Sequence, residues 1–398
     1  MTSQNKPMAA AALAALLAMT PIAGWLRAQP ADGFAAVAPR MQEFVDRGEA
    51  AGVVTLVATP DRILHLGAVG RTDLAGSRKM QADDIFWIAS MSKPVTSVCI
   101  AILADDGKLS LDDPLARLLP EFAGLMVTRN GETVKPSRAV TLRDVMTHTS
   151  GLGEMPAREP HLTLAETSER LARQPLRFQP GSRWAYSTAG IDILGRVVEV
   201  ASGMAFDEFL QKRVLDPLRM KDTGFWIAPG KESRYAHPYR WNAPAGKLEE
   251  TVIPYLYNTA VTDRRRPPLG GAGLFSTAGD MARFYQMMLH QGALDGARIL
   301  KPGTVAEMTR KQTGALTARP GMPWGLGFCV VEDPAGMAAN SVLSPNSFGH
   351  GGAFSTGSWA DPSKGLIWIV MFERDGHGNP DNSDVRIAFQ EAASKGLR

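Results

Sequence analysis

Ser90 and Lys93 stand three residues apart at the start of a long apolar segment. On a helix, positions i and i+3 share one face, so the lysine amine would lie within hydrogen-bond reach of the serine hydroxyl. There the amine can accept the hydroxyl proton, or its positive charge can stabilise the serine oxygen as the proton leaves. Either effect turns an unreactive alcohol into a nucleophile. A capping serine beside a snorkelling lysine has the same spacing, so this motif alone leaves both interpretations open.

Two further motifs carry groups that can donate or relay a proton. Tyr186 stands in a turn, residues 180–190, that leads into a helical pattern, and nearby cations would lower the pKa of its phenol. His350 stands among glycines, which let a backbone approach a ligand closely, and its ring can donate a hydrogen bond. Taken singly, each motif has a structural explanation. Tyr186 could be a core tyrosine whose hydroxyl has a hydrogen-bond partner, and the glycines around His350 could form a tight turn.

The elements that must position these groups come from both ends and from the middle of the chain. Apolar spacing predicts an amphipathic helix from Phe34 to Val45, and most of the pattern from residue 90 to 262 is helix and loop. Strands are predicted near both ends. The predicted strands cover 53–58, 63–69, 327–331 and 366–372, and further helices cover 141–146, 165–172, 191–200 and 384–394.

Strands at both ends with helices between them predict an α+β fold. We expect one antiparallel sheet, flanked by helices, built from about 33–90 and 270–398. A mostly helical domain over about 91–269 would be inserted into it.

Composition narrows the class of protein. The 398 residues are 44% hydrophobic and 21% charged, which is enough for a large core, and the formal charge of +3 argues against nucleic-acid binding. Cys99 and Cys329 lie in apolar runs, which favours buried free thiols over a disulfide between them. The seven histidines form no metal-ligand motif, so we expect neither a metal nor another cofactor.

Residues 1–28 have the pattern of a secretory signal peptide. Lys6 precedes an apolar stretch, no acidic residue occurs, and the segment ends at Leu26-Arg27-Ala28, with cleavage expected near Ala28. Thr20 and Pro21 interrupt the apolar part, which argues against a permanent membrane span. The mature chain is therefore predicted to begin near residue 29 and to be periplasmic or secreted.

In this order, the three motifs resemble those of the serine β-lactamase and penicillin-recognising enzyme family, in its class C-like branch with the family VIII carboxylesterases. The likeness extends to residues 142–152, 216–223 and 271–277 and covers nearly all of the chain after the signal peptide. It implies a β-lactamase/transpeptidase-like fold.

The resemblance also implies roles for individual residues. Ser90 would be the acylated nucleophile, Lys93 its base or charge partner and Tyr186 the proton relay, and either Lys93 or Tyr186 could take the serine proton. Backbone N–H groups of Ser90 and Ala353 would form the oxyanion hole. The substrate-binding residues would be His350, Gly351, Gly352, Thr188 and Trp359. His148, in contrast, is interpreted as a structural hydrogen bonder.

Two departures from the class C pattern concern substrate binding. Thr188 replaces the asparagine of Tyr-x-Asn, so one hydroxyl stands where a carboxamide would pair with a substrate amide. His350 replaces the lysine of Lys-Thr-Gly, and a histidine with an ordinary pKa of about 6.5 is mostly neutral where a lysine would attract the β-lactam carboxylate. Peptidases of the family can also carry histidine there.

These departures favour a carboxylesterase acting on small or medium esters. The first alternative is an amide-directed enzyme: a DD-peptidase or D-amino-acid peptidase acting on peptidoglycan fragments, or a weak class C-like β-lactamase. The second alternative is a non-catalytic cell-wall recognition protein. The sequence does not indicate an oligomeric state.

Overall fold

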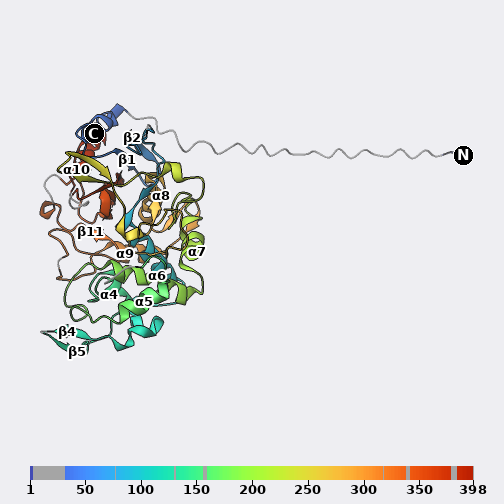
Figure 1. The fold of residues 1–398 in the computed structure, drawn as a ribbon. Helices are drawn as coiled ribbons and strands as arrows, with labels where there is room; N and C mark the ends of the chain where they lie inside the picture. The colour runs from blue at the N-terminus through green and yellow to red at the C-terminus, as the bar shows by residue number, and fades with distance from the viewer. Residues whose placement is uncertain are drawn as a thin grey trace.

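A computed structural model gives the fold of the chain (Figure 1). It describes residues 1–2, 32–76, 78–129, 131–155, 159–316, 318–337, 341–377 and 383–397. Apart from its first two residues, the predicted signal peptide lies outside these ranges. Within them, no helix has the length and apolar character needed to cross a membrane.

A six-stranded antiparallel sheet is built from both ends of the chain. Its strand order is β11-β12-β13-β14-β1-β2. Strands from the two ends meet where β1 pairs with β14, and there Leu56 lies opposite Ile369. The strands are β1 (Gly52–Ala58), β2 (Ile63–Gly70), β11 (Cys329–Val330), β12 (Phe348–Gly352), β13 (Thr356–Asp361) and β14 (Leu366–Met371). The predicted α+β fold class is confirmed.

Helices cover both faces of this sheet. Helices α1 (Val37–Asp46) and α10 (Asp384–Ser394) pack against each other and against the sheet on one face, and α8 (Ala278–Leu289) packs on the other. Successive strand residues alternate between the two resulting cores: Leu56 joins the core with α8, and Val57 joins the core with α1 and α10. Burial of both faces explains why the central strand β14 is apolar throughout.

The middle of the chain forms a helical region, which Figure 1 shows around α4 and α5, at the end of the molecule away from α10. Helix α2 packs against α6, and α6 also contacts α5 and α7. The helices are α2 (Ser92–Asp105), α3 (Leu115–Leu118), α4 (Leu142–Met146), α5 (Leu164–Ala172), α6 (Thr188–Ser202), α7 (Phe206–Leu210) and, further along, α9 (Pro302–Thr309). Cys99 and Cys329 are buried and are not joined by a disulfide, as predicted.

Short strands complete the fold, and none of them was predicted. The hairpin β6 (Tyr239–Asn242) and β7 (Lys247–Glu250) lies in the region expected to be helix and loop, and β6 pairs with β15 (Arg374–Asp375). Residues 239–250 therefore lie beside the C-terminal part of the chain. The other short pairs are β3 (Phe86–Trp87) with β8 (Phe275–Ser276), β4 (Val127–Arg129) with β5 (Glu132–Val134), and β9 (Ala293–Leu294) with β10 (Ala297–Arg298).

Candidate active site

Ser90 lies on a tight turn between strand β3 and helix α2. The turn, Ala89–Met91, is a 3-10 helix, and Ala89 has a φ of 45°. A non-glycine residue in this left-handed region costs about 1–3 kcal/mol and persists only where the surroundings enforce it. Lys93, in the first turn of α2, is fully buried, and its Nζ donates a hydrogen bond to Ser90 Oγ over 3.1 Å.

A segment nearly two hundred residues away holds Lys93 in place. Its Nζ donates a second hydrogen bond, of 2.7 Å, to the carbonyl of Gly271. The carbonyls on either side of that residue accept from Thr96 Oγ1 over 2.8 Å and from Trp87 Nε1 over 2.6 Å. Because an ammonium group loses its hydration on burial, these acceptors are needed to keep Lys93 inside the protein.

Tyr186 joins Lys93 to His350. Its ring centre lies 4.5 Å from Lys93 Nζ, a cation–π contact. Its hydroxyl lies 3.5 Å from Nε2 of His350, which is buried on β12. The other ring nitrogen, Nδ1, lies 2.5 Å from the carbonyl oxygen of Gly351, and because a carbonyl only accepts, Nδ1 carries the hydrogen. In the neutral ring, Nε2 is then the acceptor that faces the tyrosine hydroxyl.

An aromatic cage surrounds Tyr186. The ring of His148 lies 4.5 Å from the tyrosine ring, and Trp324 lies 5.9 Å from it and 5.4 Å from His350. Burial, then the charge of Lys93, and repulsion from His350 whenever that ring is protonated, hold the pKa of His148 well below its usual value. Its neutral Nδ1 accepts a hydrogen bond from the backbone N–H of Ser187, next to Tyr186. Sequence reasoning did not find Trp324, because only the folded contacts bring it to this site.

The end of strand β12 closes on the turn that carries Ser90. A Cβ atom on Gly352 would lie 2.4 Å from the carbonyl oxygen of Ile88, so only glycine allows this approach. The next residue, Ala353, begins a 3-10 turn that contacts the turn of Ser90. Strand β12 ends before Ala353, and the chain bends there because Phe354 has a φ of 63°.

Comparison with known protein families identifies the family to which the chain belongs. A family model described as Beta-lactamase matches residues 37–393. The chain belongs to the β-lactamase family. This confirms the predicted resemblance, and the protein is a serine hydrolase of that family.

Individual β-lactamase-family relatives agree with this class. Esterase EstB of Burkholderia gladioli is 32% identical over 359 residues, covering 80% of this chain and 85% of EstB. Lovastatin esterase of Penicillium rubens is 31% identical over 318 residues, covering 74% and 78%. Among solved structures, EstCE1, a hydrolase with promiscuous acyltransferase activity, has a TM-score of 0.77 and 25% identity, covering 90% of this chain and 97% of EstCE1. The protein is thus similar to carboxylesterases, as predicted.

Of the two remaining predicted substrate-binding residues, Thr188 lies beside the site and Trp359 lies in the core. Thr188 begins α6 directly after the tyrosine turn, and its backbone N–H donates to Oε1 of Glu154 over 2.5 Å. The exposed Glu154 carboxylate, which sequence reasoning did not find, therefore interacts with the positive end of the α6 dipole beside Tyr186. Trp359 lies opposite Gly349 on β13, and its side chain is 1% exposed within the core shared with α1 and α10. That burial gives Trp359 a packing role and leaves it no surface for a substrate.

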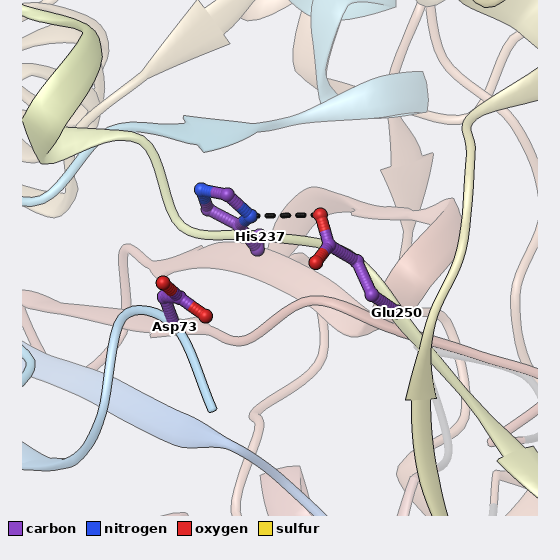
Figure 2. A group of neighbouring side chains, drawn as sticks. All are labelled: Asp73, His237 and Glu250. Atoms are coloured by element: carbon purple, nitrogen blue, oxygen red, sulfur yellow. Dashed lines mark hydrogen bonds and ion pairs between the residues drawn. The ribbon is translucent and has the colours of Figure 1, made fainter. Parts of the chain in front are cut away.

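Another group of side chains, which could act as metal ligands, does not include any of the residues described above. Within the described ranges, ligand atoms of Asp73, His237 and Glu250 lie within 4.8 Å of one another, as Figure 2 shows. His237 Nδ1 and Glu250 Oε1 are 2.8 Å apart, and these two side chains are 35% and 52% exposed. Their arrangement is that of a surface hydrogen bond beside a second carboxylate.

Proposed function

We propose that this serine hydrolase cleaves small or medium carboxylic esters through an acyl-enzyme on Ser90. The observation that carries the proposal is the hydrogen bond between Lys93 Nζ and Ser90 Oγ, with the Tyr186 ring packed on the same ammonium group. The neutral form of the Lys93 amine, held at this distance, can accept the serine proton, as nucleophilic catalysis requires.

Acylation begins when Ser90 Oγ attacks the ester carbonyl carbon and its proton passes to Lys93 or Tyr186. The backbone N–H groups of Ser90 and Ala353 stabilise the oxyanion that forms. The bond to the alkoxy oxygen then breaks, and the leaving alcohol takes a proton from Tyr186. In deacylation, water gives a proton to the same group and attacks the acyl carbon, which releases the acid and restores the Ser90 hydroxyl.

Two residues support an ester rather than a β-lactam or peptide substrate. Thr188 provides a hydroxyl where an asparagine would pair with a substrate amide, and His350 stands where a lysine would attract a carboxylate. The relatives named as esterases support the same substrate class.

The test compares p-nitrophenyl butyrate with a chromogenic cephalosporin, following product release and covalent mass gain, beside a Ser90→Ala control. We expect fast ester turnover that depends on Ser90 and little cephalosporin cleavage. Preferential cephalosporin turnover, or a long-lived adduct with it, would replace the proposal by the amide-directed alternative, with peptidoglycan fragments as candidate substrates. Inactivity on both substrates would favour a recognition protein.

We also propose that residues 1–28 direct export and are removed. The proposal is supported by the early lysine, the apolar stretch and the absence of acidic residues. Intact-mass spectrometry of the secreted protein tests it, and a mass that includes residues 1–28 would contradict it.

A further inference from the structure

Asp192 is a buried carboxylate joined to Lys93 through a single residue. It lies on α6, four residues after Thr188, and is fully buried. Its Oδ1 accepts hydrogen bonds from the Gly271 backbone N–H over 2.7 Å and from the Tyr255 hydroxyl over 2.5 Å. The carbonyl of the same glycine accepts the hydrogen bond from Lys93. The two ends of Gly271 therefore link α6 to the lysine.

The packing around Gly271 leaves no room for a side chain at this position. A Cβ atom on this residue would lie 2.6 Å from the carbonyl oxygen of Thr188 and 2.7 Å from Asp192 Oδ1. Asp192 fixes the N–H end of Gly271, and Lys93 binds its carbonyl end. A rotation of Gly271 would therefore disturb both hydrogen bonds at once.

Tyr255 holds the other side of the carboxylate. It comes from the 3-10 turn Pro254–Leu256, and its half-buried ring lies 6.1 Å from that of Trp87. Trp87 in turn donates to the carbonyl of Ala272, next to Gly271. Tyr255 is thus connected to the segment that binds Lys93 through both its hydroxyl and its ring.

We propose that Asp192 and Tyr255 are positioning residues for Lys93: Asp192, held by Tyr255, orients Gly271 so that its carbonyl keeps the lysine amine against Ser90. The inference rests on the proposed function of Ser90 as an acylated nucleophile. Neither Asp192 nor Tyr255 belongs to the three motifs, and their connection to Lys93 follows from the hydrogen bonds alone.

The charge of Asp192 adds an effect that packing alone would not produce. A carboxylate near an amine favours the ammonium form, so the neutral amine that can accept a proton forms at a higher pH. Titratable groups near Lys93 include Tyr186 before α6, whose ring packs on the amine, and His148 after α4. His350 on β12 contacts the hydroxyl of this tyrosine. These groups stay the same when Asp192 is replaced, so a change in pH dependence reports on Asp192.

The experiment measures acylation of Ser90 in Asp192→Asn and Tyr255→Phe from about pH 5 to about pH 10. Two readouts are used: the pre-steady-state burst with p-nitrophenyl butyrate, and the rate of covalent mass gain with a p-nitrophenyl phosphonate ester. The second readout reports nucleophile activation even if esters are not the natural substrates. Matched controls are Asp361→Asn, another fully buried aspartate, and Tyr239→Phe, whose buried hydroxyl accepts from the backbone N–H of Leu74.

We expect Tyr255→Phe to slow both reactions about tenfold, the effect of losing one buried hydrogen bond, without shifting the acid limb of the pH profile. Asp192→Asn should also slow them and should move that limb about one unit toward lower pH. Both controls should react like the wild type. If Asp192→Asn does not fold, Tyr255→Phe still decides the question.

Wild-type phosphonylation rates in both variants would overturn the positioning proposal, whatever the ester result. In another outcome, the wild-type protein fails to hydrolyse the ester while its phosphonylation still depends on Asp192 and Tyr255. That result would contradict only the proposed ester substrate. A slowed Asp192→Asn with an unshifted acid limb would overturn the part of the proposal that concerns charge.

Discussion

The Lys93 ammonium nitrogen lies 4.5 Å from the centre of the Tyr186 ring, while the hydroxyl of the same tyrosine points to His350. The ring and the hydroxyl therefore act on different partners. The ring stabilises the buried positive charge, and the hydroxyl is the group that can move a proton.

Replacing Tyr186 by phenylalanine separates these two contributions. Tyr186→Phe keeps the ring against Lys93 and removes the proton relay, so we expect kcat for p-nitrophenyl butyrate to fall by about 10²- to 10⁴-fold. KM should stay within about threefold and the melting temperature should be nearly unchanged, because the packing of the cage is retained. Steady-state kinetics and thermal unfolding measure these quantities. A kcat close to that of the wild type would exclude the tyrosine as the relay.

Gly352→Ala tests the approach of strand β12 to the Ser90 turn. The added Cβ would lie 2.1 Å from Thr356 Oγ1 and 2.4 Å from the Ile88 carbonyl oxygen, so the backbone before Ala353 must move. If the Ala353 N–H belongs to the oxyanion hole, we expect kcat/KM to fall by about 10²- to 10³-fold. Gly357→Ala on the adjacent strand is the control, since the nearest atom to its Cβ is 3.8 Å away. Equal losses in the two variants would contradict this explanation.

His148 makes stability depend on pH. Its pKa in the folded protein lies well below 6.5 because burial, Lys93 and His350 disfavour its charged form. The unfolded chain therefore binds the proton first, and stability is complete above about pH 6.5 and falls as the pH decreases below it. Denaturant unfolding from pH 8 to pH 5 should show a loss steeper by up to about 1.4 kcal/mol per pH unit than in His148→Gln. Parallel curves for the two proteins would contradict a neutral His148.

Asp280, in the first turn of α8, makes stability depend on pH in the opposite direction to His148. Burial raises the pKa of its carboxyl from 3.8 to about 6, so ionisation near neutrality costs stability, and the penalty grows as the pH rises from about 4 to 6. In Asp280→Asn, the amide oxygen can still accept from the Asp222 N–H and the Thr223 hydroxyl. We expect the variant to be more stable at pH 8 by up to about 3 kcal/mol and equally stable near pH 4. A variant that is less stable at pH 8 would show that the carboxylate is needed.

Local patterns predicted the parts of the site that lie close together in the chain. Ser90 and Lys93 share one turn, and the glycines around His350 mark the approach of a backbone. The strands and helices with clear apolar periodicity were also predictable, because burial on one or both faces determines which residue types occur. Leu366–Met371 and Asp384–Ser394 are examples.

The rest of the site depends on contacts between distant segments. Trp324, Glu154 and Asp192 have no local signature, because each acquires its role from residues far away in the sequence. The β6–β7 hairpin has strands of only four residues with several charges, so no alternation of apolar residues marks it. Trp359 follows the glycine motif closely in sequence, but its register opposite Gly349 directs its side chain into the core.

The hydrogen bonds that tie residues 270–272 to the nucleophile helix also determine when reactivity arises during synthesis. A growing chain exposes Ser90 and Lys93 early, long before the ribosome has made the carbonyl of Gly271 that orients the lysine. The strand end at Gly352 is made later still, within the last fifty residues. A chain that is truncated before this point carries the complete serine–lysine motif but has no Gly352 to close on the Ser90 turn. Reactivity at Ser90 thus depends on a chain that has been made at least as far as Gly352 and has folded.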